Sequence, residues 1–128
     1  MSRVVLDASA LLALLNDEPG AEKLTLDLLG SASCSTVNLA EVQTKLVNEG
    51  GSPEEAWEDA LSPIREAVPF TEDQAKIAGS LAAQTLRWGL SLGDRACLAL
   101  GIALNAPVYT ADRNWRKLRL GVQIHVIR

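Results

Sequence analysis

A short apolar segment that ends on a carboxylate constrains the fold of this chain more than any other part of its sequence. Residues 4–6 are Val-Val-Leu, a composition typical of a short buried strand, and Asp7 follows them directly. The apolar run at 10–15 then has the composition of a helix. In an open parallel α/β sheet, ligands bind in the crevice beyond the carboxyl ends of the strands. Asp7 is therefore expected where chemistry takes place, and Ser9 at a helix start that can hold an anion.

The rest of the chain alternates between strand-like and helical segments, separated by glycine, proline and polar turns. This alternation predicts one α/β domain with a mostly parallel sheet and helices on both faces. The predicted strands after the first lie at 32–34, 64–70, 107–110 and 122–127. The predicted helices lie at 10–15, 21–29, 37–48, from 53 onward, 72–88, 94–105 and 112–118, with 90–93 as a loop.

Composition excludes several classes of protein. The 128 residues suit one domain with a real core, and the 48% hydrophobic content is ordinary for a globular protein. No apolar run is long enough to cross a bilayer, and Asp7 interrupts the apolar N-terminal segment, so neither a membrane span nor a signal peptide is predicted. A cytoplasmic location is the default expectation. Cys34 and Cys97 are expected to be buried thiols, and the lone His125 is expected to be structural.

The first predicted helix is apolar on nearly all sides. Its four leucines cannot all face one core, and a helix that is apolar all round is buried on both sides. They are Leu11, Leu12, Leu14 and Leu15. We expect one side of this helix to pack on the sheet and the other to be covered by a neighbouring helix or by a partner chain.

Four acidic residues occupy positions that suit a structural role as well as a functional one. Asp7 suits a turn or a helix cap, and Asp112 suits the N-cap of the helix that follows it. Glu41 suits a solvated helix face, paired with Lys45 four residues on. Asp94 opens the most apolar helix, where an acid is stabilising without any function. Taken one at a time, only Asp94 favours a functional role.

Taken together, the four acids predict a single site. Asp7 and Asp112 each follow a predicted strand, and Asp94 opens a helix. Glu41 lies on a helix that follows the second strand, so all four belong to the carboxyl edge of a parallel sheet. Carboxylates gathered there without a cation would repel one another. Such oxygen ligands suit Mg²⁺ or Mn²⁺, which acidifies a bound water and stabilises charge on a phosphoryl oxygen. The chain has no P-loop.

Four segments, taken in order, match the pattern of a known family. They are 5–20, which begins Val-Leu-Asp-Ala-Ser-Ala; 35–42, Ser-Thr-Val-Asn-Leu-Ala-Glu-Val; 90–100, which begins Leu-Ser-Leu-Gly-Asp-Arg; and 108–112, Val-Tyr-Thr-Ala-Asp, with Trp115 beyond. With these segments the chain resembles the PIN-domain ribonucleases, and specifically the VapC-type toxins of toxin–antitoxin systems. No single segment is decisive, but the four in sequence are specific and together extend over essentially the whole chain.

The resemblance implies a single PIN-like domain over residues 1–128, with a three-layer fold and a five-stranded sheet in the order 3-2-1-4-5. It implies an endoribonuclease that depends on Mg²⁺ or Mn²⁺ and cuts single-stranded or structured RNA. It also implies that the protein is the toxin of a pair, a homodimer held by a cognate antitoxin that covers the active-site groove. The doubly apolar first helix fits such an antitoxin contact.

The resemblance also assigns roles to individual residues. Asp7 and Asp94 would be the main metal ligands and catalytic acids. Glu41 would complete the acidic site directly or through water, and Asp112 would be the fourth and most variable acid. Three polar neighbours would orient carboxylates or water. They are Ser9, Asn38 and Thr110.

Charge is the point at which this chain departs from an ordinary RNA-cutting enzyme. Its net charge is −4 and its pI about 4.9, whereas nucleic-acid binders usually have a basic balance. Cations bound at the acids would offset part of this locally. A basic rim would supply further RNA contacts; its candidates are Arg87, Arg95, Arg113 and Arg116, with Lys117 and Arg119 beside them. Trp115 is expected in the core, while Trp88 stays open between the core and base stacking.

Interpretations from other classes stay open at this point. A phospho-accepting receiver domain is also small, acidic and doubly wound, but it needs a close acid pair after its first strand and an acceptor Asp after its third. Here Asp7 stands alone, and the segment 68–71 contains no Asp. A PIN fold kept only as a binding module is disfavoured because all four acids are present. Among enzymes, an RNA-processing nuclease without an antitoxin fits the same residues.

Overall fold

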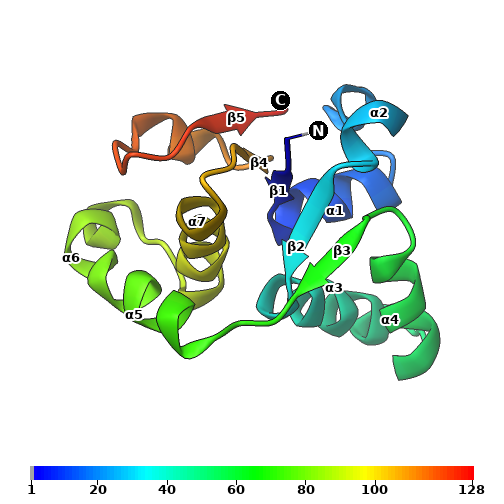
Figure 1. The fold of residues 1–128 in the computed structure, drawn as a ribbon. Helices are drawn as coiled ribbons and strands as arrows, with labels where there is room; N and C mark the ends of the chain where they lie inside the picture. The colour runs from blue at the N-terminus through cyan, green and yellow to red at the C-terminus, as the bar shows by residue number, and fades with distance from the viewer. Residues whose placement is uncertain (1) are drawn as a thin grey trace.

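Five parallel strands form the centre of the computed structural model, which describes residues 2–128 (Figure 1). The strands are β1 (Val4–Leu6), β2 (Ala32–Ser35), β3 (Glu66–Val68), β4 (Val108–Thr110) and β5 (Ile124–Val126). They pair in the order β3-β2-β1-β4-β5, and every pair is parallel. The predicted α/β class and the predicted strand order are confirmed.

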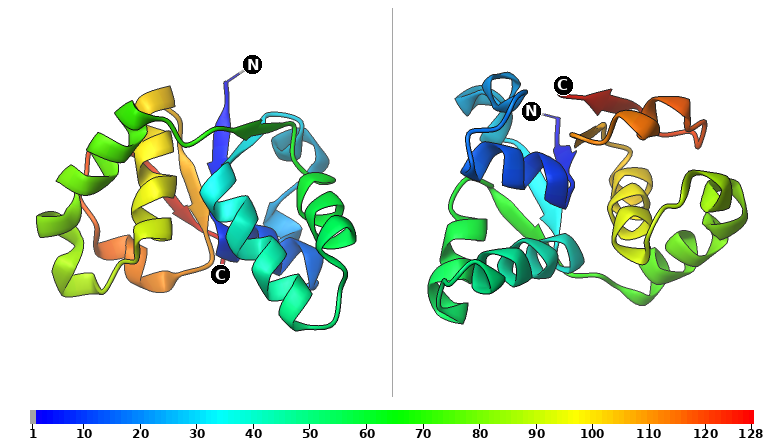
Figure 2. Two further views of the ribbon diagram at one scale, coloured as in Figure 1. Left: turned by 90° about the horizontal axis from the view of Figure 1, so that it is seen from below. Right: turned by 180° about the vertical axis from the view of Figure 1, so that it is seen from behind.

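Helices cover both faces of this sheet and complete the three layers (Figures 1 and 2). On one face α1 (Ala8–Leu15), α3 (Thr36–Asn48) and α4 (Pro53–Leu61) pack together. On the other face α7 (Leu92–Leu104) contacts the strands, and α5 (Glu72–Ser80) packs against α7. The remaining short helices are η1 (Ala21–Lys23), α2 (Leu26–Leu29), α6 (Ala82–Thr85), η2 (Leu86–Trp88) and η3 (Arg113–Lys117).

Strand β1 supplies side chains to the cores on both faces of the sheet. Successive strand residues point to opposite faces. Val5 is fully buried among residues that include Cys97 and Leu98 of α7, whereas Leu6 is fully buried in a second cluster with Ala10 of α1. Because β1 is the central strand and is packed from both sides, the position of its carboxyl end is well fixed.

The apolar first helix packs against other elements on two sides. Ala10 packs with Leu6 of the sheet, whereas Leu11 packs with Leu39 and Val42 of α3. All of these side chains are fully buried. The neighbouring helices therefore cover part of the second side of α1, whereas Leu12, Leu14 and Leu15 are half-buried. A partner chain on this side stays a prediction.

Two predicted helices are interrupted. The segment 21–29 is divided between η1 and α2, because Thr25 starts a new helix with its hydroxyl oxygen, which accepts a hydrogen bond from the Leu28 N–H at 3.3 Å. The segment 72–88 is divided into α5, α6 and η2. Its first break falls at Leu81, which is buried in the cluster with α7. Tertiary packing here outweighs the helical preference of the local sequence.

Helix α7 begins at Leu92, two residues before the predicted start at Asp94. Ser91 is its N-cap: the Ser91 hydroxyl accepts a hydrogen bond from the Asp94 N–H at 3.1 Å, and the Asp94 carboxylate accepts one from the Ser91 N–H at 3.0 Å. The stretch 90–93, predicted as a loop, is thus partly helical. Asp94 lies in the first turn of α7 and not at its start.

Several residues expected to be structural have that role. Cys34 and Cys97 are buried free thiols. His125 on β5 stacks on Tyr109 of β4, with ring centroids 4.7 Å apart. Trp115 is fully buried in the core. Among the helices formed by residues 2–128, none combines the length and the hydropathy that crossing a membrane would require.

Candidate acidic site at the carboxyl edge of the sheet

The carboxyl ends of β1 and β4 lie next to each other at the point where the strand order changes direction. Strands β2 and β3 lie on one side of β1, and strands β4 and β5 lie on the other. Asp7 follows β1 and Thr110 ends β4, so both lie at this switch point, the usual ligand position in open α/β sheets. The view from behind in Figure 2 faces this edge, around which α1, α3 and α7 begin.

Asp7 is the most buried of the four predicted acids, with 3% of its surface exposed. It caps α1 by accepting a hydrogen bond from the Ala10 N–H at 2.8 Å. The Ser9 hydroxyl donates to it at 2.8 Å, and the Thr110 hydroxyl donates from the adjacent strand at 2.6 Å. Three donors therefore fix this carboxylate, and one of them joins the start of α1 to β4.

Burial raises the pKa of Asp7 from 3.8 to about 6. The hydrogen bonds from Thr110, Ala10 and Ser9 lower this pKa, and the nearby negative charge of Asp94 raises it further. Removal from water outweighs the three donors, so the ionised form is under-stabilised and a cation would favour it. A buried carboxyl whose pKa is raised, at the carboxyl edge of a parallel sheet, is typical of a functional position.

Asn38 holds Glu41 and the start of α7 together. Its amide nitrogen donates to Glu41 Oε1 at 2.8 Å and to Gly93 O at 3.0 Å. Lys45, the predicted surface partner of Glu41, instead lies 4.0 Å from Glu49. Glu41 is exposed to solvent, yet its carboxylate contacts α7 and not the lysine of its own helix.

Gly93 allows Glu41 to approach α7 closely. Gly93 is buried, and a Cβ atom at this position would collide with both carboxylate oxygens of Glu41 and lie 2.6 Å from its Cδ atom. Only glycine leaves this space empty. Glu41 therefore contacts the first turn of α7, the turn that also contains Asp94. The sequence signals this role only through a glycine directly before the acid, within a segment predicted as a loop.

Asp94 and Asp112 each use one carboxylate oxygen to cap a helix. Asp94 Oδ2 closes the capping box of α7, and Asp112 Oδ1 accepts a hydrogen bond from the Asn114 N–H at 2.9 Å at the start of η3. The cap expected at Asp112 is therefore present. Asp112 is tied to the site through its backbone, since its N–H donates to Thr110 Oγ1 at 3.0 Å. That same hydroxyl donates to Asp7.

Two buried thiols lie within reach of the charges of three acids. Burial is the main cause that raises the pKa of Cys34 and of Cys97. The negative charges of Asp7 and Glu41 raise the pKa of Cys34 further, and those of Asp7, Asp94 and Glu41 do the same for Cys97. The charges of these three carboxylates therefore act on the same part of the core.

The site has the donor chemistry for a divalent cation, although it is not closed around one. Within residues 2–128, no three Asp, Glu, His or Cys side chains converge in an arrangement that could hold an ion. Two observations fit a hard cation: the Asp7 carboxylate is desolvated, and Asn38 Oδ1 is buried without a donor from the described part of the chain. The metal-ligand set is still a prediction. It consists of Asp7, Glu41, Asp94 and Asp112.

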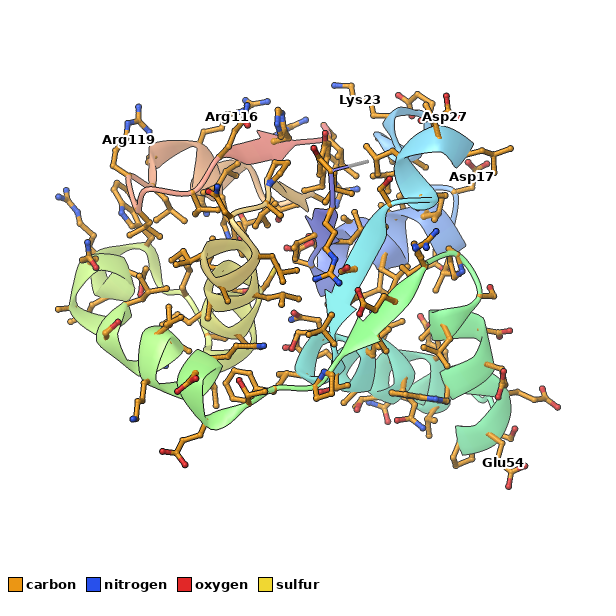
Figure 3. All side chains as sticks on the ribbon, in the orientation of Figure 1. Asp17, Lys23, Asp27, Glu54, Arg116 and Arg119 are labelled. Carbon is orange, nitrogen blue, oxygen red and sulfur yellow. The ribbon has the colours of Figure 1, made fainter. Side chains whose placement is uncertain are left out.

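Two arginines of the predicted basic rim make hydrogen bonds that join separate parts of the fold. Arg95 donates to Ala78 O at 2.9 Å and so joins α7 to α5. Arg116 donates to the carbonyl of Arg128 at 3.1 Å. Figure 3 shows Arg116 projecting from the same rim as Arg119. Their role toward RNA stays a prediction.

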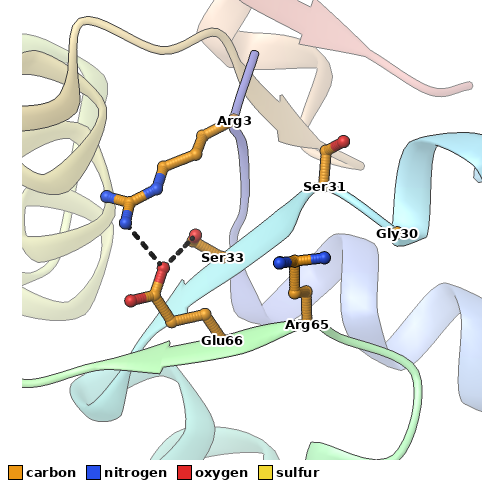
Figure 4. A pocket seen from close by; sticks show the side chains of 6 residues that line it. All are labelled: Arg3, Gly30, Ser31, Ser33, Arg65 and Glu66. Atoms are coloured by element: carbon orange, nitrogen blue, oxygen red, sulfur yellow. Dashed lines mark hydrogen bonds and ion pairs between the residues drawn. The ribbon is translucent and has the colours of Figure 1, made fainter. Parts of the chain in front are cut away.

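A hollow lies at the opposite, amino end of β1, β2 and β3 (Figure 4). Its volume is about 460 Å³, and its lining includes Arg3, Ser33, Arg65 and Glu66. The Glu66 carboxylate already lies 3.2 Å from the Arg3 guanidinium and accepts from the Ser33 hydroxyl at 3.3 Å. Because this hollow is separated from the four acids by the length of the strands, the candidate site does not include it.

One family model matches the sequence, that of the PIN domain, over residues 4–120. No curated protein gives a significant match to the chain.

Several solved structures share the fold. VapBC2 from Rickettsia felis, bound to a DNA fragment from its promoter, has a TM-score of 0.74 at 20% identity, with 98% of each chain covered. DNA-bound VapBC from Salmonella typhimurium has a TM-score of 0.75 at 16% identity, with 100% of each chain covered. VapC20 from Mycobacterium tuberculosis, a toxin that cleaves the sarcin-ricin loop, has a TM-score of 0.73 at 20% identity, with 94% of this chain and 98% of that chain covered. At these identities the likeness establishes the fold alone.

Proposed function

Because the chain belongs to the PIN-domain family, we propose that it is a metal-dependent endoribonuclease acting at the carboxyl edge of its sheet. The observation that most supports this proposal is the desolvated Asp7 carboxyl, with its pKa raised to about 6, close to the charge of Asp94. A structural cap gains nothing from such burial, whereas a cation ligand does.

The acids would divide the work of holding the ion. In this proposal Asp7 and Asp94 are the main ligands of Mg²⁺ or Mn²⁺. Glu41 completes the site, and Asp112 assists. Such an ion, when bound, supplies an acidified water and neutralises charge on the phosphoryl group.

Three polar residues act as positioning residues in the same proposal. Thr110 and Ser9 donate to Asp7, so they fix its orientation and favour its ionised form. Asn38 fixes Glu41, and its second hydrogen bond to Gly93 O joins α3 to the start of α7. Removing one of these donors should lower cleavage about 10- to 100-fold, the usual cost of losing a group that orients a metal ligand.

We also propose that the protein is the toxin of a toxin–antitoxin pair, working as a homodimer held by a cognate antitoxin. The likeness of its whole fold to chains of VapBC complexes supports this. The expected finding is an adjoining gene whose product binds the protein and stops its RNA cleavage. An enzyme that cuts RNA and has no such inhibitor would instead be an RNA-processing nuclease.

Cleavage of a labelled single-stranded RNA by the purified protein tests the enzymatic activity. The reactions contain Mg²⁺, Mn²⁺ or a chelator, and they compare the wild type with Asp94→Asn. The matched control is Asp59→Asn, which removes an exposed carboxylate from α4. We expect cleavage that needs the metal, is lost in Asp94→Asn and is retained in Asp59→Asn. Cleavage that persists in the chelator, or absence of metal binding in calorimetry, would contradict the proposal.

A further inference from the structure

The positive charge of this acidic chain is concentrated at its C-terminal end. Residues 113–128 contain five of the twelve Lys and Arg residues and none of the sixteen Asp and Glu residues. The net charge of −4 therefore hides a strongly negative first part and a positive last part. Most of the positive charge of this last part lies on or next to η3, since Arg113, Arg116 and Lys117 belong to it and Arg119 follows.

Trp88 brings cations from two separate elements together. The Arg87 guanidinium carbon, on η2, lies 4.8 Å from the centroid of the Trp88 ring. The Lys117 ammonium nitrogen, on η3, lies 5.3 Å from the same centroid. Two like charges would otherwise repel, and the electron-rich ring face attracts both. The Trp88 side chain is itself held in place, because it packs against the core cluster that contains Trp115 and Leu118.

These cations are available to a ligand. Arg87, Arg113 and Lys117 are all exposed. Within residues 2–128, the four ion pairs of the chain involve other basic residues, namely Arg3, Lys45, Lys76 and Arg128. A cation without a carboxylate partner on a surface keeps its full attraction for an anion.

The cationic residues begin directly after Asp112. Asp112 caps η3, and its N–H donates to the Thr110 hydroxyl that donates to Asp7. Arg113 is the next residue, and Lys117 ends the helix. A five-residue 3₁₀-helix spans about 10 Å, so Lys117, which contacts Trp88, lies about that far along η3 from Asp112. The left view of Figure 2 shows η3, in orange, beside the yellow-green segment that contains α6 and η2.

We propose that the surface formed by Arg87, Trp88, Arg113 and Lys117 binds the phosphate backbone of single-stranded RNA and leads it to the acidic site. The inference rests on the proposed ribonuclease activity and adds where the substrate lies. Four carboxylates repel a polyanion, so a strand that reaches them needs positive charge directly beside them. This surface begins directly after Asp112. RNA has to reach the acids to be cut, whereas an acidic protein segment need not extend to them, so the position of the surface favours RNA. Trp88 serves to hold the two cations, since they cover its ring.

Salt-dependent RNA binding by the full chain tests this proposal. The protein bears Asp94→Asn so that the RNA stays intact, and the probe is a fluorescein-labelled 15-nucleotide single-stranded RNA of mixed sequence. Its affinity is measured by anisotropy between 50 and 200 mM KCl. Each phosphate contact on a single strand contributes about 0.7 to the slope of log K against log salt. Adding Arg87→Gln and Lys117→Gln should therefore lower the magnitude of the slope by about 1.4. The matched control replaces Lys23 and Lys76 by Gln, which removes the same charge elsewhere.

The outcomes separate this inference from the proposed function. An unchanged slope in the Arg87→Gln, Lys117→Gln protein, while the enzyme with native Asp94 still cuts RNA, overturns the surface and leaves the ribonuclease proposal standing. An equal decrease in the Lys23, Lys76 control shows an effect of net charge and also overturns it. Unchanged RNA binding with lost binding of polyglutamate assigns the surface to an acidic protein partner. A protein that neither binds nor cuts RNA contradicts the ribonuclease proposal itself.

Discussion

Replacing Asp7 by Asn should make the metal-free protein more stable at neutral pH. The side chain is 3% exposed, and burial is the largest cause that raises its pKa from 3.8 to about 6. Asn has nearly the same shape and no charge, so Asp7→Asn removes the cost of burying the ionised carboxylate. At an ordinary, exposed helix-cap aspartate the same change would leave stability almost unaltered, since Asn caps a helix about as well as Asp does.

The magnitude follows from linkage between protonation and folding. Between pH 3.8 and about 6, the folded state retains a proton that the unfolded state has lost, so the unfolding free energy falls as the pH rises. One pKa unit corresponds to about 1.4 kcal/mol, so the full decrease is about 3 kcal/mol and is complete near pH 7. The Asn variant lacks this decrease. Part of the decrease has already occurred at pH 4, so the stability difference between variant and wild type should grow by about 2 to 2.5 kcal/mol from pH 4 to pH 7.

Urea unfolding in the presence of a chelator measures this difference at pH 4, 5, 6 and 7. Asp59→Asn is the control, because Asp59 is exposed on α4. Adding Mg²⁺ at pH 7 should stabilise the wild type more than Asp7→Asn, since a bound cation stabilises the ionised carboxylate. An Asp7→Asn protein whose stability difference from the wild type stays constant between pH 4 and pH 7 would refute the reasoning.

Three further predictions concern the site and the helix beside it. Gly93→Ala should displace the Glu41 carboxylate and so lower RNA cleavage about 10- to 100-fold. The stability of this variant to urea should change by less than about 1 kcal/mol, because alanine favours the helix. Unchanged cleavage would show that Glu41 need not lie there. Thr110→Val should raise the pKa of Asp7 and shift the acid limb of the pH–rate profile to higher pH, whereas Thr44→Val on the surface of α3 should not. Leu11→Ala should cost about 2–5 kcal/mol in thermal or urea unfolding, and Leu26→Ala, at 88% exposed, should cost almost nothing; equal effects would contradict the described burial of α1.

Local chemistry accounts for the parts of the fold that the sequence predicts well. Ser52 and Thr71 cap the helices that follow them, and each acts only on residues two to four positions away. The buried strand before Asp7 is likewise evident from its own three residues. The strand order is expected only from the family resemblance, because the sequence of one segment does not show which distant strand it pairs with.

The features that the sequence does not predict depend on packing between distant elements. The break at Leu81 exists because that side chain turns toward α7, and nothing in the sequence periodicity marks it. The approach of Glu41 to Gly93 depends on how closely α3 and α7 pack. Likewise, the contact between Trp88 and Lys117 joins two segments that lie almost thirty residues apart in the sequence. The sequence predicts which acids share an edge of the sheet, and the packing of helices decides how near they come.

The helix caps formed by Asp94 and Asp112 also limit how many carboxylate oxygens each residue can offer to a metal ion. Asp94 Oδ2 and Asp112 Oδ1 are each engaged by a backbone N–H, which leaves one oxygen of each without such a bond. A carboxylate held in this way can offer an ion a single oxygen without giving up its helix. Mg²⁺ takes six compact, octahedral ligands, whereas Ca²⁺ often takes both oxygens of a carboxylate in a larger shell. The same hydrogen bonds that start α7 and η3 should therefore make Ca²⁺ a poor substitute for Mg²⁺ in this protein.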